Sequence, residues 1–141
     1  MQIRKHVQRG MTLIELLVVL VILGLIASIA GPQVMNYASS SKSKAAALQI
    51  KDLSNALDIY KLDNGRYPTT QEGLDALIKA PAGASNWRKG YLTGSSVPKD
   101  PWHNEYKYAS PGDGRDFDIV SYGADGKQGG EGENKDITSW E

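Results

Sequence analysis

The feature that most constrains this chain is a long apolar run that carries one charge. Between Met11 and Gly31 every residue is uncharged except Glu15. About 20 helical residues, at a rise of 1.5 Å each, match a hydrocarbon core roughly 30 Å thick. The run can therefore cross a membrane as a single helix. A carboxylate in such a segment costs roughly 3 kcal/mol, which indicates that Glu15 is kept for a purpose.

Three interpretations fit this N-terminal segment. The first is a signal anchor that stays uncleaved, and the second is a secretory signal peptide with Ser28-Ile29-Ala30 as its small-x-small cleavage site. In the third, cleavage between Gly10 and Met11 creates an α-amino group one helical turn before Glu15. Only this third interpretation gives the carboxylate a cation in the same layer of the membrane. That amine could cap Glu15 of its own chain. In a helical stack it could instead come from the neighbouring subunit, and the pair would then fix the axial register.

The residues around this site carry a family resemblance. A short basic leader followed by Gly10-Met11-Thr12-Leu13-Ile14-Glu15 resembles the prepilin signal of type IV pilins and type II secretion pseudopilins. The resemblance implies that an inner-membrane peptidase cuts after Gly10 on the cytoplasmic side and N-methylates Met11. It implies that Glu15 is the assembly glutamate. Residues 1–10 are then a leader, residues 11–31 the transmembrane and assembly helix, and residues 32–141 a periplasmic domain.

An amphipathic helix is predicted beyond the apolar run. Pro32 should kink or loosen a helix that otherwise continues. Asn64-Gly65 supplies a stop signal. Between these points apolar residues recur at alternating spacings of four and three, which predicts one face buried against a domain core. The face consists of Ala46, Ile50, Leu53, Leu57 and Tyr60.

The rest of the chain predicts an α+β fold. Thr69 and Glu72 fit a capping box, and Leu74, Leu77 and Ile78 would form one face of a short helix that ends near Ala80-Pro81. The segments 105–109 and 116–121 alternate or cluster apolar residues as strands do. Two or three antiparallel strands would then cover the long helix, which gives an α+β domain. The family resemblance implies that this domain is pilin-like.

The stretches "YKLDNGRYPTTQEGLDAL", "DPWHNEYKY" and "SYGADGKQGGEGENKDI" are similar to the major pseudopilins of type II secretion. His103 stands at a turn where this family often has glycine. The resemblance implies a structural subunit that polymerises with itself and works with minor pseudopilins, a prepilin peptidase and an inner-membrane assembly platform. The alternatives are a subunit of a type IV surface pilus and a membrane-anchored calcium-binding module that never polymerises.

The C-terminal part of the chain, from about residue 122 to 137, is predicted to be a calcium-binding loop. It is rich in glycine and acids, and calcium accepts backbone carbonyls alongside a few carboxylates. An EF-hand does not fit, because Lys127 and Gly129 occupy ligand positions. By resemblance, Asp125 is the first acidic ligand, with carbonyls from residues such as Tyr122, Lys127 and Gly130. The candidates for the second ligand are Asp136 and Asn134, followed by Glu133.

The composition of the chain narrows the range of functions that it could have. The chain contains no cysteine, so it cannot form the C-terminal disulfide that is common in type IV pilins, and calcium would serve in its place. Its 16 basic and 16 acidic residues balance, which gives no pull toward nucleic acid. Bases precede the apolar run, which favours a cytoplasmic N-terminus, and acids dominate the C-terminal part, which favours cation binding there. The family resemblance implies that the membrane is the inner membrane. No pattern of catalytic residues occurs, so we expect no enzyme.

Overall fold

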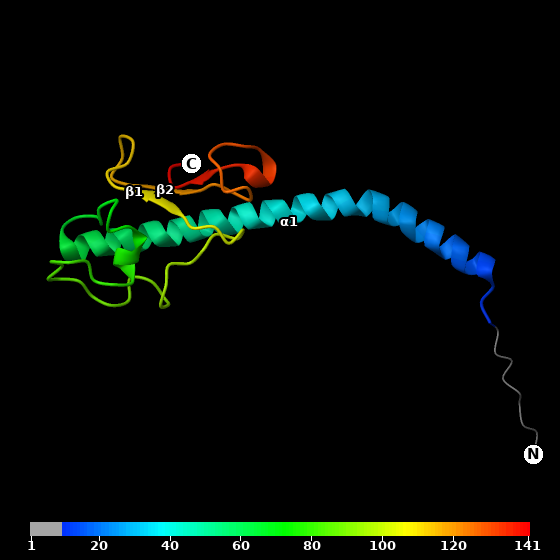
Figure 1. Cartoon of the computed structure of the whole chain (residues 1–141), viewed down its shortest axis with the longest axis horizontal. Helices are drawn as coiled ribbons and strands as arrows, with labels where there is room; N and C mark the ends of the chain where they lie inside the picture. The colour runs from blue at the N-terminus through cyan, green and yellow to red at the C-terminus, as the bar shows by residue number, and fades with distance from the viewer. Residues whose placement is uncertain (1–9) are drawn as a thin grey trace, which may run out of the picture. The chain divides into compact units, whose positions relative to one another are not determined.

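The computed structural model describes residues 10–141 and contains one α-helix, two short 3-10 helices and three strands in that part of the chain (Figure 1). The basic residues of the leader, at positions 1–9, lie outside the described residues. Two compact units can be distinguished, one that ends at Tyr37 and one that comprises Ala38–Glu141. The second unit contains the sheet and the core.

Helix α1, Leu13–Asn64, confirms the predicted long N-terminal helix. Its buried residues are the predicted stripe together with Ala56, which lies between two of its members. The helix ends where the sequence placed the stop: Gly65 follows with φ of 77°, and its amide donates to the carbonyl of Lys61 at 2.7 Å. Only glycine adopts this backbone conformation at little cost. Helical structure continues through Pro32, so this proline does not end or interrupt the helix.

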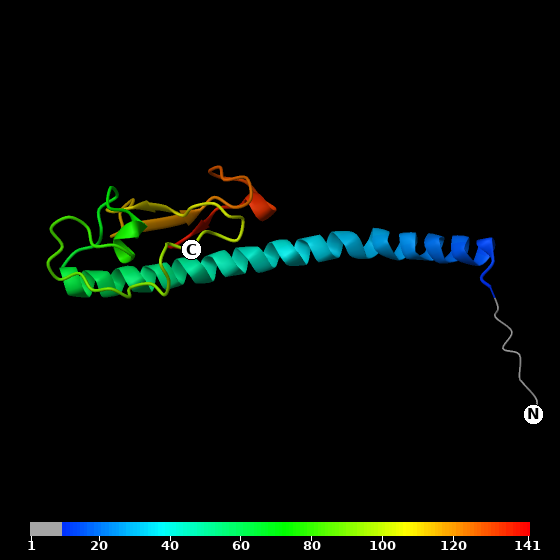
Figure 2. The same cartoon turned by 60° about the horizontal axis from the view of Figure 1, so that its bottom comes forward.

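The three strands form an antiparallel sheet in the order β1-β2-β3. β1 is Lys107–Ala109, β2 is Asp118–Ser121 and β3 is Ile137–Thr138. Ile119 in β2 is fully buried and joins the core that the α1 stripe forms with Tyr91 and Tyr106. Figure 2 shows the sheet alongside the C-terminal half of α1. This arrangement places the link between β2 and β3 at one end of the sheet, where the candidate calcium loop lies.

The short helix after α1 differs from its prediction. It is a 3-10 helix, η1, which covers only Leu74–Leu77. The predicted capping box does form, because the Thr69 amide donates to Glu72 at 2.8 Å and the Glu72 amide donates to the Thr69 hydroxyl at 3.2 Å. However, Gly73 follows with φ of 64°, which interrupts helical geometry directly after the box. The box therefore closes a turn before η1 and does not start a regular α-helix.

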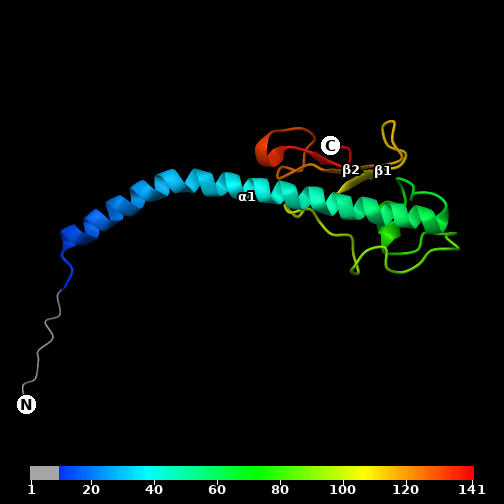
Figure 3. The ribbon, with the colours of Figure 1, turned by 180° about the vertical axis from the view of Figure 1, so that it is seen from behind.

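Between η1 and β1 the described chain has no regular element. Figure 3 shows this segment running back along α1 before it enters β1. Side chains fix it in place: the Trp87 indole donates to the carbonyl of Ala76 at 2.7 Å, and Arg88 makes two bonds to the Asp63 carboxylate at 2.6 and 2.9 Å. The segment thus packs on the helix without a backbone ladder of its own.

The Arg66–Glu72 pair predicts acid sensitivity in this part of the fold. Both guanidinium nitrogens lie 2.7 Å from the carboxylate, and this bond, aided by Thr69, lowers the pKa of Glu72 to about 2. The resulting stabilisation is complete above the ordinary pKa of 4.5 and is lost as pH falls toward 2. We expect Glu72→Gln to cost about 1 kcal/mol at pH 7, because glutamine keeps the acceptor for the Thr69 amide but loses the charge that binds Arg66.

Thermal melting across pH checks this expectation. The difference in Tm between the parent and Glu72→Gln should be present at pH 7 and should shrink steadily as pH falls from about 5 to about 2. A difference that stays constant over this range would contradict the proposed role of the ionised carboxylate.

Candidate functional site

The first candidate site is the N-terminal end of α1. Gly10, Met11 and Thr12 precede the helix, and Glu15 lies in its first turn. The Thr12 amide donates to the Glu15 carboxylate at 2.9 Å, and the Glu15 amide donates to the Thr12 hydroxyl at 3.3 Å. This is a second capping box, and it satisfies two amides at the start of the helix. Glu15 therefore has a partner within its own chain before any subunit contact forms.

Thr12 was not singled out from the sequence, although the signal was present. Thr12-Leu13-Ile14-Glu15 is the same Ser/Thr-x-x-Glu pattern that predicted the box at Thr69 and Glu72. The surroundings of Glu15 are apolar: Met11, Ile14, Val18 and Val19 line the surface next to it. None of the described residues that line this surface beside Glu15 carries a charge.

The apolar part of α1 has the properties of a membrane span. Among the described residues, α1 is the one helix long and apolar enough to cross a membrane, and none of its apolar window is buried within the chain. Leu13, Leu20 and Ile29, for example, are all well exposed. Such a surface requires lipid or other protein chains around it.

A second exposed apolar surface lies on α1 within the compact unit that follows. Leu48, Ile59 and Leu62 are 61%, 48% and 84% exposed. Their spacings of eleven and three residues are close to whole helical turns, so they share one face of α1, opposite the buried stripe. We call these three residues the outer face of α1. Its side chains are available for contact with another molecule.

The second candidate site is the loop between β2 and β3. Ser121 pairs with Ile137, so residues 122–136 form the connection of a β-hairpin. Its two arms lie against one another, because the Ala124 amide donates to the carbonyl of Glu133 at 2.8 Å. Gly123 and Gly130 both have positive φ, and a Cβ on either would lie under 3 Å from the opposite backbone, at Glu133 and Asn134 respectively. The glycines therefore permit the close crossing of the loop.

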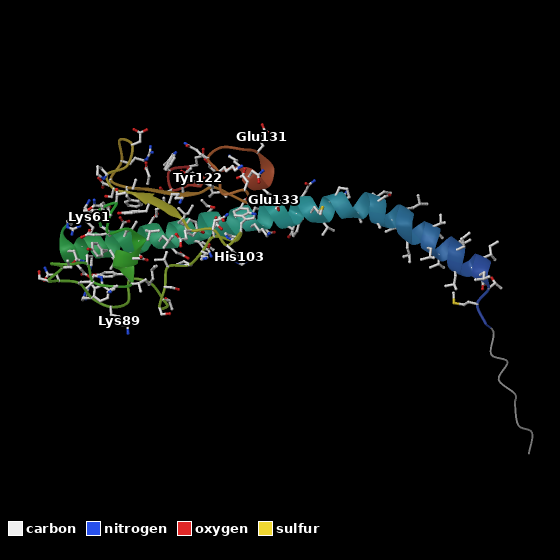
Figure 4. All side chains as sticks on the ribbon, viewed as in Figure 1. Lys61, Lys89, His103, Tyr122, Glu131 and Glu133 are labelled. Carbon is white, nitrogen blue, oxygen red and sulfur yellow. The ribbon has the colours of Figure 1, made fainter. Side chains whose placement is uncertain are left out.

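All the predicted ligand residues lie in this one loop. Figure 4 labels Tyr122, Glu131 and Glu133 around it and His103 on the neighbouring turn. Within the loop, Asp125 accepts the Lys127 amide at 3.1 Å and Asp136 accepts the Gly129 amide at 2.9 Å. A short 3-10 helix, η2, spans Gly132–Asn134, which the sequence did not predict. The predicted residues share a loop, but their role as ligands stays a prediction.

One carboxylate oxygen in the loop has the surroundings expected of a cation ligand. Oδ1 of Asp136 is buried and has no hydrogen-bond partner among the described residues. A buried carboxylate oxygen without a donor is costly unless a positive charge meets it. Within residues 10–141, no three acidic or histidine side chains converge on one point. A site here would therefore combine Asp136 and Asp125 with backbone carbonyls, an all-oxygen set of the kind that calcium accepts.

Comparison with known proteins identifies the family. Residues 33–140 match the family model described as type II secretion system protein G, and residues 5–31 match the prokaryotic N-terminal methylation motif. The type II secretion system core protein G of Pseudomonas aeruginosa is 48% identical over 98% of this chain and 99% of that protein. The core protein G of Vibrio cholerae is 46% identical over 94% of this chain and 92% of that protein.

A solved structure supports the same assignment. The crystal structure of the major pseudopilin from the type 2 secretion system of enterohaemorrhagic Escherichia coli superposes with a TM-score of 0.64 at 36% identity. The match covers 75% of this chain and 92% of that chain. These findings favour a pseudopilus subunit over a surface-pilus subunit or a non-polymerising module. The chain belongs to the type II secretion system protein G family, the major pseudopilins.

Proposed function

We propose how this chain, a structural subunit of the type II secretion pseudopilus, is anchored in the membrane and processed before it assembles into a filament. It is anchored by α1 in the inner membrane, with its N-terminus in the cytoplasm and residues 32–141 in the periplasm. A prepilin peptidase cleaves between Gly10 and Met11 and methylates the new amine. The observation that carries this proposal is Glu15, a carboxylate in a membrane-spanning segment one helical turn after that cleavage site. The match of residues 5–31 to the methylation motif supports it.

Cleavage changes what surrounds Glu15. In the uncleaved chain the carboxylate accepts the Thr12 amide, a neutral donor. After cleavage the amine of Met11 adds a cation in the same layer of the membrane. Between neighbouring subunits, this amine and Glu15 form a charge pair in lipid that holds only at one axial offset. We infer that the pair sets the register of the growing filament, which minor pseudopilins begin and an inner-membrane assembly platform extends.

The family is structural, and we propose no catalytic role for the chain. We propose instead that the loop 122–137 binds calcium through the carboxylates of Asp125 and Asp136, with Asn134 as a further candidate and carbonyls of Tyr122, Lys127 and Gly130 beside them. The buried, unpaired Oδ1 of Asp136 supports this proposal. Bound calcium would supply the positive charge that this oxygen requires. It would close the loop between β2 and β3, which no disulfide can do in a chain without cysteine.

The outer face of α1 provides the test of lateral assembly. The double variant Ile59→Lys/Leu62→Lys should fold normally, because both side chains are exposed. It should reduce the number of fibres severely, because two ammonium groups would lose their hydration at each subunit contact. Sheared fibres are counted by electron microscopy after overexpression. The double variant Gln71→Lys/Asn86→Lys, which adds the same two charges at exposed positions outside this face, serves as the matched control. Normal fibre numbers from Ile59→Lys/Leu62→Lys would exclude this face from the subunit interface.

A further inference from the structure

A turn that precedes β1 is bonded to the candidate calcium loop. The turn comprises residues 100–104 and closes on itself: the Asp100 amide donates to the carbonyl of Asn104 and the His103 amide donates to the carbonyl of Asp100, both at 2.9 Å. Asp100 is only 2% exposed. Its Oδ1 accepts the amides of Trp102 at 3.0 Å and Asn104 at 2.8 Å. The buried carboxylate therefore holds the turn in one shape.

The backbone conformation of His103 is one that a non-glycine residue disfavours, so the turn must be held by its hydrogen bonds. His103 has φ of 69°, in the left-handed region that favours glycine, and it is the one non-glycine residue with positive φ in the described chain. Four hydrogen bonds that involve Asp100 or Asn104 hold the turn against this preference. A turn held so firmly can serve as a rigid support for whatever it contacts.

The turn contacts the first arm of the loop at two points. The Ser121 hydroxyl, fully buried, donates to Oδ2 of Asp100 at 2.6 Å and accepts the Gly123 amide at 3.3 Å. The Asn104 side chain donates to the carbonyl of Gly123 at 2.9 Å. Both polar groups of the Gly123 backbone are thus bonded, through Ser121 or directly, to the turn. The start of the loop cannot rotate without breaking these bonds.

The Asn104 side-chain amide also lies near Gly126. A Cβ added to Gly126 would lie 3.7 Å from the amide oxygen and nitrogen of Asn104. The Asn104 side chain therefore bonds the backbone at Gly123 and lies near it at Gly126, and the segment between these two positions contains Asp125. On its other side, Gly123 is covered by Glu133. The backbone that presents Asp125 is held from two directions.

We propose that Asn104, held by the Asp100 turn, is a positioning residue for calcium. By bonding the Gly123 carbonyl beside Gly126, it orders the arm that presents Asp125 before the cation binds. Calcium then spends less of its binding free energy on ordering the loop, which is the advantage of a preorganised site. Outer-shell partners of metal ligands typically change affinity by roughly 10- to 100-fold when they are removed. The inference rests on the calcium site proposed above.

To test this inference, calcium affinity is measured by titration calorimetry on the full chain in detergent micelles. The Tm of the same protein is measured in calcium and in EGTA. We expect Asn104→Ala to raise the calcium Kd roughly tenfold or more, while its Tm in EGTA stays near that of the parent, because Asn104 is not part of the hydrophobic core. Asn86→Ala, which removes an exposed asparagine outside the loop, should leave the Kd unchanged. If Asn104→Ala does not fold, Asn104→Ser, which keeps a small polar side chain in the turn, takes its place.

The outcomes separate this inference from the proposal on which it rests. If the parent binds no calcium, the calcium site itself is wrong and the positioning role fails with it. If the parent binds calcium and the Asn104 variants bind it equally well, the site stands and the positioning role is overturned. An equal loss of Tm in calcium and in EGTA, with unchanged Kd, would assign Asn104 to the fold alone and would also overturn the inference.

Discussion

Glu15→Gln is expected to leave the subunit cleaved and in the membrane but to abolish fibre assembly. Glutamine keeps an acceptor for the Thr12 amide and so preserves the capping box, but it removes the charge that the Met11 amine would meet. Loss of one partner from a desolvated charge pair costs about 3 kcal/mol or more. Because every subunit contact in a filament repeats this loss, fibres should fall below detection.

Glu15→Ala separates the two roles of the side chain. It removes both the charge and the acceptor for the Thr12 amide, so any fall in cleavage or in the amount of membrane-bound subunit beyond that of Glu15→Gln measures the cap. Ser28→Ala, a polar-to-apolar change in the same segment, is the control. Cleavage is followed by gel mobility, and fibres by electron microscopy of the sheared fraction. Normal fibres and normal secretion from Glu15→Gln would exclude charge pairing as the source of filament register.

Removal of calcium is expected to have the second large effect. If calcium is present at about 100 times its Kd, binding stabilises the native state by about 2.7 kcal/mol. For a unit of this size, that corresponds to a fall in Tm of on the order of 10 °C when EGTA is added. Asp125→Ala and Asp136→Asn should each abolish the difference between calcium and EGTA. Glu131→Gln, an exposed acid of the same loop, should preserve it.

The EGTA condition gives the sharper result for Asp136. Asparagine keeps an acceptor for the Gly129 amide and replaces the unpaired carboxylate oxygen by a neutral group, so the variant should melt no lower than the parent without calcium. In calcium it should melt well below the parent. A variant that melts below the parent by the same amount in both conditions would show that Asp136 supports the fold and not the cation.

Local sequence patterns predicted the elements whose causes are local. The buried stripe of α1 follows from helical spacing, and its end follows from a glycine with positive φ at Gly65. The strands β1 and β2 proved shorter than the predicted segments 105–109 and 116–121. β3 has only two residues, too few for any alternation to identify it.

The candidate calcium site was predictable only in part, because local patterns do not reveal contacts between segments that are distant in the sequence. Glycines and acids between residues 122 and 137 mark the loop in the sequence itself. The support for that loop comes from Asn104, whose bond to Gly123 joins segments nineteen residues apart. No spacing rule connects such residues, because the sheet brings them together only after the chain has folded. The capping box at Thr12 is local, and the Ser/Thr-x-x-Glu pattern that identified Thr69 and Glu72 could have predicted it as well.

The most direct test of this account is the intact mass and N-terminal sequence of the subunit recovered from sheared fibres. The account predicts fibres that contain the chain, a first residue of Met11, and a mass greater by one methyl group than that of residues 11–141. Fibres built from a chain that still begins at Met1, or a protein that begins at Gly31 and forms no fibres, would contradict it.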